Sequence, residues 1–169
     1  ERQRGAYAAR NLALSRARAP VIAFTDADCT VARDWVRSLL AAFADDSVGM
    51  VVGHCQYPAE ASWAMRQLGA WENAKTEYIA RCCPNANQIA YCNNLAVRAD
   101  LFHELGLFKP WQRAGDSEFA HRMGCERPDL RLVFASDMRI THHEFPRARE
   151  RARRLRLYTE TNSRIPGFR

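Results

Sequence analysis

The pattern that most constrains the fold is a short apolar run placed between two helical segments. Residues 21–25, with the sequence VIAFT, are mostly β-branched and aromatic, and Pro20 separates them from a helix predicted over residues 6–18. Apolar residues then recur at helical spacing over 35–43, and a second apolar run follows at 49–57. A strand, a helix and a second strand at this spacing predict a crossover connection. We therefore expect an α/β domain with a mostly parallel sheet flanked by helices.

The rest of the chain continues the alternation of helices and strands. The remaining predicted elements are a helix over 61–80, a loop over 82–88, two short strands within 89–97, a helix from Asp100, a helix over 115–124, and a last strand over 130–136 with its exit over 138–143. The 169 residues contain no internal repeat, low-complexity tract or linker. A chain of this length is enough for one core, so we expect a single domain over 1–169.

The start of the chain is unusual for such a domain. Glu1 opens a segment that reads as a helix already under way, and no strand precedes it. We therefore expect that an N-terminal part of the natural protein is absent.

Composition and cysteine spacing favour an intracellular protein. No run approaches the roughly 18 apolar residues of a membrane span, and nothing at the start resembles a signal peptide. The six cysteines form no Cys-x-x-Cys pair, and Cys82 and Cys83 are adjacent. Reduced thiols in a cytoplasmic compartment are the expected state, and a structural zinc site is not expected.

Two carboxylates follow the first apolar strand directly. Asp26 and Asp28 come after residues 21–25, and ligands of open parallel sheets bind outside the carboxyl ends of the strands. Two close carboxylates repel each other unless a cation compensates, and Mg²⁺ or Mn²⁺ commonly holds one or two carboxylates together with phosphate oxygens. The pair therefore suits a metal–diphosphate site. On this motif alone an alternative stays open, in which Asp28 caps the next helix and Asp26 faces water.

Several ordered motifs together resemble family 2 glycosyltransferases of the glycosyltransferase A fold. The segment GAYAARNLALSRARAPVIAFTDADCTV resembles the family's helix that leads to a strand ending in Asp-x-Asp, NNLAVRADLFHELGLF resembles its acceptor-side segment, and AGDSEFAHRMG is similar to its Glu-Asp-x-Asp/Glu-Leu segment. The resemblance implies a partial Rossmann-like catalytic domain. The family's opening strands, which hold the nucleobase, do not occur in this chain.

The resemblance also assigns roles at the centre of the site. Asp28 matches the direct metal ligand, and Asp26 matches the contact to the donor's ribose or to the water shell of the metal. Asp116 matches the catalytic base, although Gly115 stands where the family often has glutamate. His142 matches a histidine that can complete the metal site, with His143 as the alternative. The implied ion is Mn²⁺ or Mg²⁺, and imidazole favours Mn²⁺.

Residues farther from the metal are assigned to the two substrates. Arg10 and Asn11 are expected to reach the donor, and packing roles in their helix are the alternative. The residues expected on the acceptor side are Asn93, Asn94, Arg98 and Glu118. A turn formed by the two asparagines is the alternative for that pair. Tryptophans such as Trp63 and Trp71 could stack on a sugar, but core packing is the commoner role.

The resemblance implies an inverting, metal-dependent transfer of sugar from a nucleoside-diphosphate sugar to an acceptor hydroxyl. The acceptor would be a glycan, a lipid-linked molecule or a small molecule, in cell-envelope or polysaccharide synthesis. One carboxylate takes the acceptor's proton, and the metal neutralises the leaving diphosphate. The expected location is the cytoplasm, including peripheral contact with an anionic membrane at its inner face, and no nucleic-acid partner is expected.

Two other functions are compatible with parts of the sequence. A net charge of +6 and the arginine run PRARERARRLRLY, with Arg147, Arg149, Arg153 and Arg154, would suit a nucleic-acid or anionic-surface binding module without catalysis. A nucleotidyltransferase would also use a two-carboxylate metal edge. The first leaves the aspartate motifs unexplained, and the separate helix carrying Asp116 argues against the second.

Overall fold

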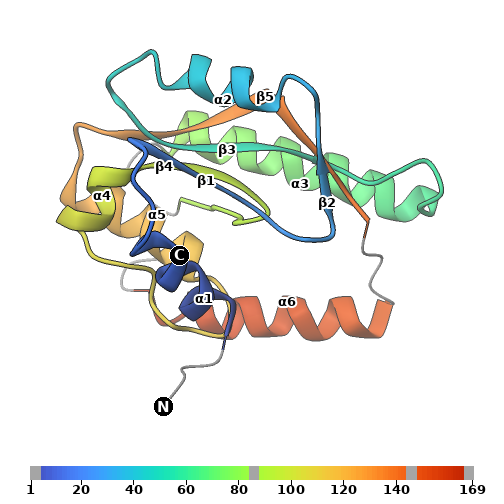
Figure 1. Cartoon of the computed structure of the whole chain (residues 1–169). Coiled ribbons are helices and arrows are strands. Elements are labelled where there is room, and N and C mark those ends of the chain that lie inside the picture. Colours follow the sequence, from blue (N-terminus) through green and yellow to red (C-terminus); the bar gives the residue numbers. More distant parts are fainter. Residues whose placement is uncertain (1–4, 84–87, 144–147, 166–169) are drawn as a thin grey trace.

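The structure, a computed structural model, describes residues 5–83, 88–143 and 148–165. Its helices are α1 (Ala6–Leu14), α2 (Trp35–Ala42), α3 (Trp63–Cys82), α4 (Ala99–Glu104), α5 (Gly115–Glu126) and α6 (Ala148–Asn162). Its strands are β1 (Val21–Thr25), β2 (Cys29–Val31), β3 (Val48–Gln56), β4 (Asn94–Arg98) and β5 (Arg131–His142). Figure 1 shows the strands in one sheet, with α2 on one face and the other helices on the opposite side or at its ends.

The sheet is mixed and mostly antiparallel, so the prediction of a mostly parallel sheet is wrong. Its strand order is β1-β4-β3-β5-β2, and β3 and β5 are the only parallel neighbours among the described strands. The reason is β4, which runs antiparallel between β1 and β3. β1 and β3 still run in the same direction, as the crossover pattern predicts, but they are not neighbours.

Three local predictions also differ from the structure. Of the two short strands expected within 89–97, only β4 forms, and residues 88–93 form an irregular segment that returns the chain to the carboxyl end of β1. The expected last strand and its exit are one strand, β5, interrupted by a bulge. β2 forms where the sequence indicates only the start of a helix, because its backbone pairs with the distant end of β5.

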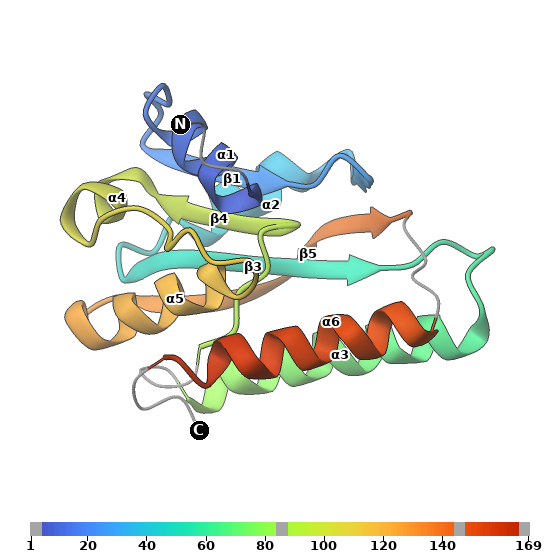
Figure 2. The same cartoon turned by 90° about the horizontal axis from the view of Figure 1, so that it is seen from below.

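Apolar side chains fill both faces of the sheet. One cluster joins the sheet to α1, α4 and α5, and its centre is a set of contacting rings from Phe24, Phe102, Phe108 and Phe119. The second cluster packs Trp35 and Leu39 of α2 against the opposite face. Figure 2 shows α3 and α6 on the other side of β3 from β1, with their long axes in nearly the same direction.

Asn94 ties three strands and α2 together inside the sheet. Its amide oxygen accepts a hydrogen bond from Trp35 Nε1 at 2.8 Å, and its amide nitrogen donates to the carbonyls of His54 (3.0 Å) and Met138 (2.7 Å). Met138 belongs to the bulge of β5, between the pairs Gly53↔Ala135 and His54↔Arg139. A Cβ on Gly53 would lie 2.2 Å from both Asn94 Nδ2 and the Met138 carbonyl oxygen, so a larger residue does not fit there.

Replacing Asn94 should therefore destabilise the fold strongly. We expect Asn94→Ala to lower the free energy of unfolding by about 3 kcal/mol, because the Trp35 N–H and two carbonyls lose their buried partner. Asn93→Ala is the matched control, since Asn93 donates only a long bond, at 3.7 Å, to Cys55 Sγ. Urea unfolding of both variants measures the difference. Equal losses in the two variants would contradict this role of Asn94.

Candidate functional site

The site lies where β1 ends and the tip of β5 reaches it. Asp26 and Asp28 follow β1, and the Cys29 N–H donates to the Asp26 carbonyl at 3.1 Å to close the turn between them. β2 then pairs antiparallel with β5 in a register that sets Cys29 opposite His142. This pairing brings the end of β5, with His142 and the following His143, beside the Asp-x-Asp turn. The His143 N–H donates to the Asp28 carbonyl at 2.8 Å, although 115 positions in the sequence separate the two residues.

Asp28, Cys29 and His142 form a cluster that can hold a metal ion. Their ligand atoms all lie within 4.8 Å of one another, and His142 Nε2 is 3.7 Å from Asp28 Oδ2. A carboxylate oxygen and an imidazole nitrogen are a donor pair that suits Mn²⁺. Burial and the neighbouring Asp28 raise the pKa of the Cys29 thiol to about 11, and Mn²⁺ and Mg²⁺ prefer oxygen ligands to sulfur. The residues therefore fit a divalent ion held by Asp28 and His142.

His143 takes a different position from His142. Its ring Nε2 lies 2.8 Å from Thr30 Oγ1, and the residue is exposed. Of the two histidines, His142 is the one that joins Asp28 in the cluster.

Asp26 is paired with Arg10 of α1. Arg10 Nη2 lies 2.6 Å from Asp26 Oδ1, and the Arg10 guanidinium stands over the Tyr7 ring at 5.4 Å. The next residue, Asn11, has its amide engaged with the backbone of Phe108, donating to the carbonyl at 2.9 Å and accepting from the N–H at 3.2 Å. Arg10 thus lies beside the turn expected to bind the sugar donor. Asn11 instead connects α1 to the segment after α4.

Asp116 is buried at the start of α5, with only 4% of its surface exposed. Its Oδ1 accepts hydrogen bonds from Tyr7 OH (2.8 Å) and Ser117 N (3.0 Å), and its Oδ2 accepts from Cys92 N (2.9 Å). Each carboxylate oxygen can accept about two bonds, so Oδ2 keeps room for one more proton. Burial raises the pKa of Asp116 above its usual range, and the three hydrogen bonds oppose that rise.

Gly115 is explained by the position of Tyr7. A Cβ at residue 115 would lie 3.1 Å from the Tyr7 ring and 2.9 Å from the Lys109 carbonyl oxygen. A glutamate at this position, as the family pattern often has, would displace the tyrosine that bonds Asp116. The hydrogen bond from Tyr7 to Asp116 therefore depends on a glycine at position 115.

Two of the residues expected on the acceptor side are engaged in holding the fold. Glu118 pairs with Arg122 at 2.9 Å, and Arg122 also donates to the carbonyl of Leu107 at 3.0 Å. Arg98 donates to the Val48 carbonyl at 2.7 Å. Because Arg98 faces Val21 in the register, it lies at the end of the sheet opposite to Asp26. Asn94 is also engaged, inside the sheet. Of the four residues expected on the acceptor side, Asn93 is the one that lines a cavity.

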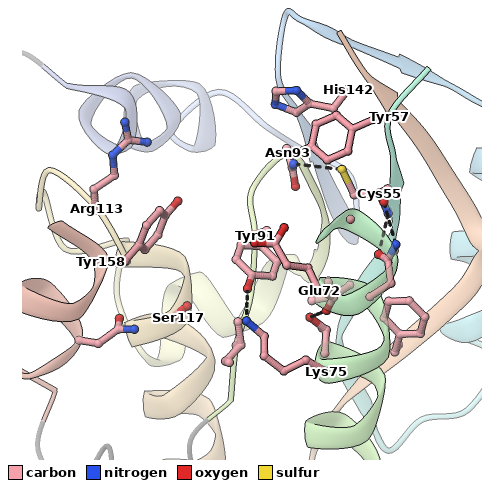
Figure 3. A pocket seen from close by; sticks show the side chains of 18 of the residues that line it. Cys55, Tyr57, Glu72, Lys75, Tyr91, Asn93, Arg113, Ser117, His142 and Tyr158 are labelled. Atoms are coloured by element: carbon pink, nitrogen blue, oxygen red, sulfur yellow. Dashed lines mark hydrogen bonds between the residues drawn. The ribbon is translucent and has the colours of Figure 1, made fainter. Parts of the chain in front are cut away.

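A cavity of about 330 Å³ opens beside this site, as Figure 3 shows. It extends from His142 and Asn93 to Ser117, the neighbour of Asp116. Further lining residues, none of them predicted from the sequence, include Tyr57, Glu72, Lys75, Tyr91, Arg113 and Tyr158. They come from segments up to about a hundred residues apart, and no local motif marks them. Trp63 and Trp71, which the sequence offered as stacking residues, are exposed and do not line it.

The arginine run is only partly described. Arg147 lies outside the described residues, as do the side chains of Arg149 and Arg154, while Arg153 is exposed on α6. Within the described parts of the chain, no helix combines the length and apolar character needed to cross a membrane.

Residues 1–106 match the family model described as Glycosyl transferase family 2. The chain belongs to this family. A curated relative, Glycosyltransferase AglE from Haloferax volcanii, is 27% identical over 110 residues, which are 64% of this chain and 34% of the relative. The chain therefore spans about a third of the length of that relative.

Solved structures share the fold of this family 2 chain. A mannosyltransferase from Pyrobaculum calidifontis, solved in complex with GDP-Man and Mn²⁺, superposes with a TM-score of 0.68 at 24% identity, covering 90% of this chain and 40% of the other. GalNAc-T7, solved with UDP, GalNAc and Mn²⁺, gives a TM-score of 0.57 at 21% identity, covering 83% and 30%. The α/β fold thus resembles the glycosyltransferase A type, with its mixed sheet.

The buried charge of Asp116 should make stability depend on pH. Because burial raises its folded pKa, its stabilising contribution is complete below the unfolded pKa and is lost as pH rises through the folded pKa. Asp116→Asn keeps the shape without the charge. We therefore expect the free energy of unfolding of this variant to rise relative to the natural chain between pH 4 and pH 7, by about 1 kcal/mol.

Asp129→Asn is a control of opposite sign for this experiment. Hydrogen bonds from Arg127 lower the pKa of Asp129, so its contribution is present above the unfolded pKa and the variant should lose stability relative to the natural chain as pH rises. Urea unfolding over this pH range measures both slopes. Parallel slopes for the two variants would show that Asp116 carries no burial penalty.

Proposed function

We propose that this chain is the metal- and base-bearing part of an inverting glycosyltransferase that transfers sugar from a nucleoside-diphosphate sugar to an acceptor hydroxyl. The observation that carries the proposal is the meeting of Asp28 and His142, 3.7 Å apart, through the β2–β5 pairing. Membership of Glycosyl transferase family 2 supports the reaction class. The acceptor, a glycan or lipid-linked molecule in cell-envelope or polysaccharide synthesis, belongs to the same proposal.

The donor side would be held at the turn after β1. Asp28 and His142 would hold Mn²⁺ or Mg²⁺, and the bound ion would neutralise charge on the departing diphosphate. Arg10, held by Asp26, adds a cation beside this turn for the donor's phosphates or ribose. The complexes of the neighbours with GDP-Man or UDP and Mn²⁺ support this arrangement.

Asp116 would act as the base for the acceptor. Its Oδ2 can accept one more proton, while Tyr7 and the Ser117 N–H hold Oδ1. Its raised pKa favours proton uptake from a hydroxyl as that oxygen attacks the anomeric carbon. Attack on the face opposite the leaving diphosphate gives inversion.

Metal binding gives the first test. Mn²⁺ with GDP or UDP should raise the melting temperature by several degrees in the natural sequence. Asp28→Asn and His142→Ala should remove the shift, because each deletes one of the two ligands. His143→Ala is the matched control and should keep it, since that ring bonds Thr30 instead.

The outcomes of this test separate the proposal from its competitors. Absence of a shift with any nucleoside diphosphate in the full natural protein would overturn the proposal. A nucleotidyltransferase would instead release pyrophosphate from its donor, whereas sugar transfer releases the nucleoside diphosphate. A nucleic-acid or anionic-surface module would show salt-dependent binding that Asp28→Asn leaves intact.

The Tyr7 hydrogen bond gives a second test, in the pH profile of transfer. Tyr7→Phe removes a donor to the Asp116 carboxylate, so the pKa of the carboxyl should rise further. We expect the acidic limb of the kcat profile of the full protein to move up by about 1 pH unit. Tyr78→Phe, at an exposed position on α3, should leave the limb in place. An unchanged limb in Tyr7→Phe would mean that Asp116 is not the base.

A further inference from the structure

We propose that the cavity between α3, β3 and α6 binds the acceptor, and that it takes the pyranose end of a glycan. This inference rests on the proposed function, since it assigns the second substrate of the same site. Glu72 of α3 and Tyr158 of α6 would contact the sugar from opposite sides of the cavity (Figure 3).

The position of the cavity suits an acceptor. His142, at the metal cluster, forms one border, and Ser117, at the start of α5, forms another. The charge of Asp116 is also felt by two lining tyrosines, because it is among the causes, after burial, that raise the pKa of Tyr158 to about 12 and the pKa of Tyr91. The cavity therefore extends from His142 of the candidate metal cluster to the first turn of α5, which carries Asp116.

The walls have the amphipathic character of a carbohydrate site. Tyr57, Tyr91, Phe134 and Tyr158 contribute rings from four different parts of the chain. The hydroxyls of Tyr91 and Tyr158 stay protonated at neutral pH, so they remain donors. Aromatic faces pack against the C–H face of a pyranose, and their hydroxyls bond its rim.

One carboxylate projects into this aromatic space. Figure 3 shows Glu72 directed from α3 toward Tyr91, and after burial the charge of Glu72 is the largest cause that raises the pKa of that tyrosine. A carboxylate can accept hydrogen bonds from two adjacent hydroxyls at once, which fits a vicinal diol. The amide of Asn93 also lines the cavity and can donate to or accept from a further hydroxyl, since its one bond with the described residues is the long one to Cys55 Sγ.

Two cationic side chains that line the cavity each lie beside aromatic side chains. Lys75 Nζ lies 3.4 Å from Tyr91 OH and 4.9 Å from the Trp71 ring centroid. The Arg113 guanidinium stands 5.8 Å over the Tyr158 ring. A phosphate would set a second negative charge beside the Glu72 carboxylate, and a prenyl chain would set apolar atoms against that carboxylate. The neutral, polar pyranose is the chemistry that uses both the rings and the carboxylate.

The test is direct binding of sugars to the 169-residue chain without metal or nucleotide. Saturation-transfer NMR with methyl glucoside, galactoside, mannoside and N-acetylglucosaminide should show contact with at least one of them. Glu72→Gln and Tyr158→Ala should weaken that binding about tenfold, because each removes a principal contact. Circular dichroism checks that both variants are folded.

Matched controls lie on the same helix. Glu77→Gln and Tyr78→Ala change the same residue types at exposed positions of α3 outside the cavity, and they should leave sugar binding unchanged. Controls that weaken binding as much as Glu72→Gln would overturn the proposal, as would binding of none of the four sugars. Tight binding of farnesyl phosphate that competes with the sugars would overturn it in favour of a lipid phosphate.

The same assay separates this inference from the proposed function. Sugar binding that requires Mn²⁺ and a nucleoside diphosphate would assign the cavity to the donor sugar and so overturn the inference, while the proposed function would stand. Sugar binding to a protein that shows no Mn²⁺-dependent shift with GDP or UDP would keep the inference about the cavity and remove the transferase proposal.

Discussion

The buried hydrogen bonds of Asn94 are the contacts on which the site depends most. They hold the bulge of β5 against β3, and that bulge decides which residue of β5 reaches the edge of the sheet. Without the three extra residues between Ala135 and Arg139, the tip of β5 would move by roughly 10 Å along the strand. His142 would then no longer face Cys29, and Asp28 would lose its neighbour. Asn94, which the sequence suggests as an acceptor contact, thus holds the candidate metal cluster in place from inside the sheet.

The parts of this architecture that the sequence could predict are those encoded locally. Residues 21–25 carry their own strand pattern, and the helix that follows carries its own period, so both were predicted near their observed places. Asp28 and His142 stand in an ordered family pattern, from which the sequence predicts them as metal ligands, and the structure brings the two side chains within 3.7 Å of each other. The antiparallel insertion of β4 could not be predicted in the same way. It depends on residues 88–93 returning the chain to the carboxyl end of β1, and the backbone N–H of Cys92 in that segment is fixed by a carboxylate 24 residues away. The cavity depends still more on long-range packing, because α3 and α6 are far apart in the chain.

Several of the arginines that make the chain basic are engaged in contacts within the protein. Arg98, Arg122 and Arg10 are engaged with backbone carbonyls or carboxylates, so part of the positive charge stabilises the fold and the site rather than forming an open face. Arg10 shows the coupling most clearly. It pairs with Asp26 at the turn after β1, and its charge also reaches Asp116, the proposed base. One side chain on α1 therefore interacts with both the proposed donor turn and the proposed base.

The lack of a side chain at Gly115 leaves room for Tyr7, and Tyr7 holds the Asp116 carboxylate. A base needs a carboxylate held in one orientation, with a pKa high enough to take up a proton. In this chain the burial of Asp116 provides the high pKa, and Tyr7 provides the orientation by a bond of 2.8 Å. Burial that suits the base also opposes folding, because the charged carboxylate leaves water. The bonds from Tyr7, Cys92 and Ser117 reduce that penalty without neutralising the charge, whereas a cation in direct contact would lower the pKa and weaken the base. Neutral hydrogen-bond donors around the buried carboxylate therefore limit the loss of stability while the pKa stays raised. Tyr7 is one of these donors, and it can approach Asp116 because Gly115 has no side chain to displace it.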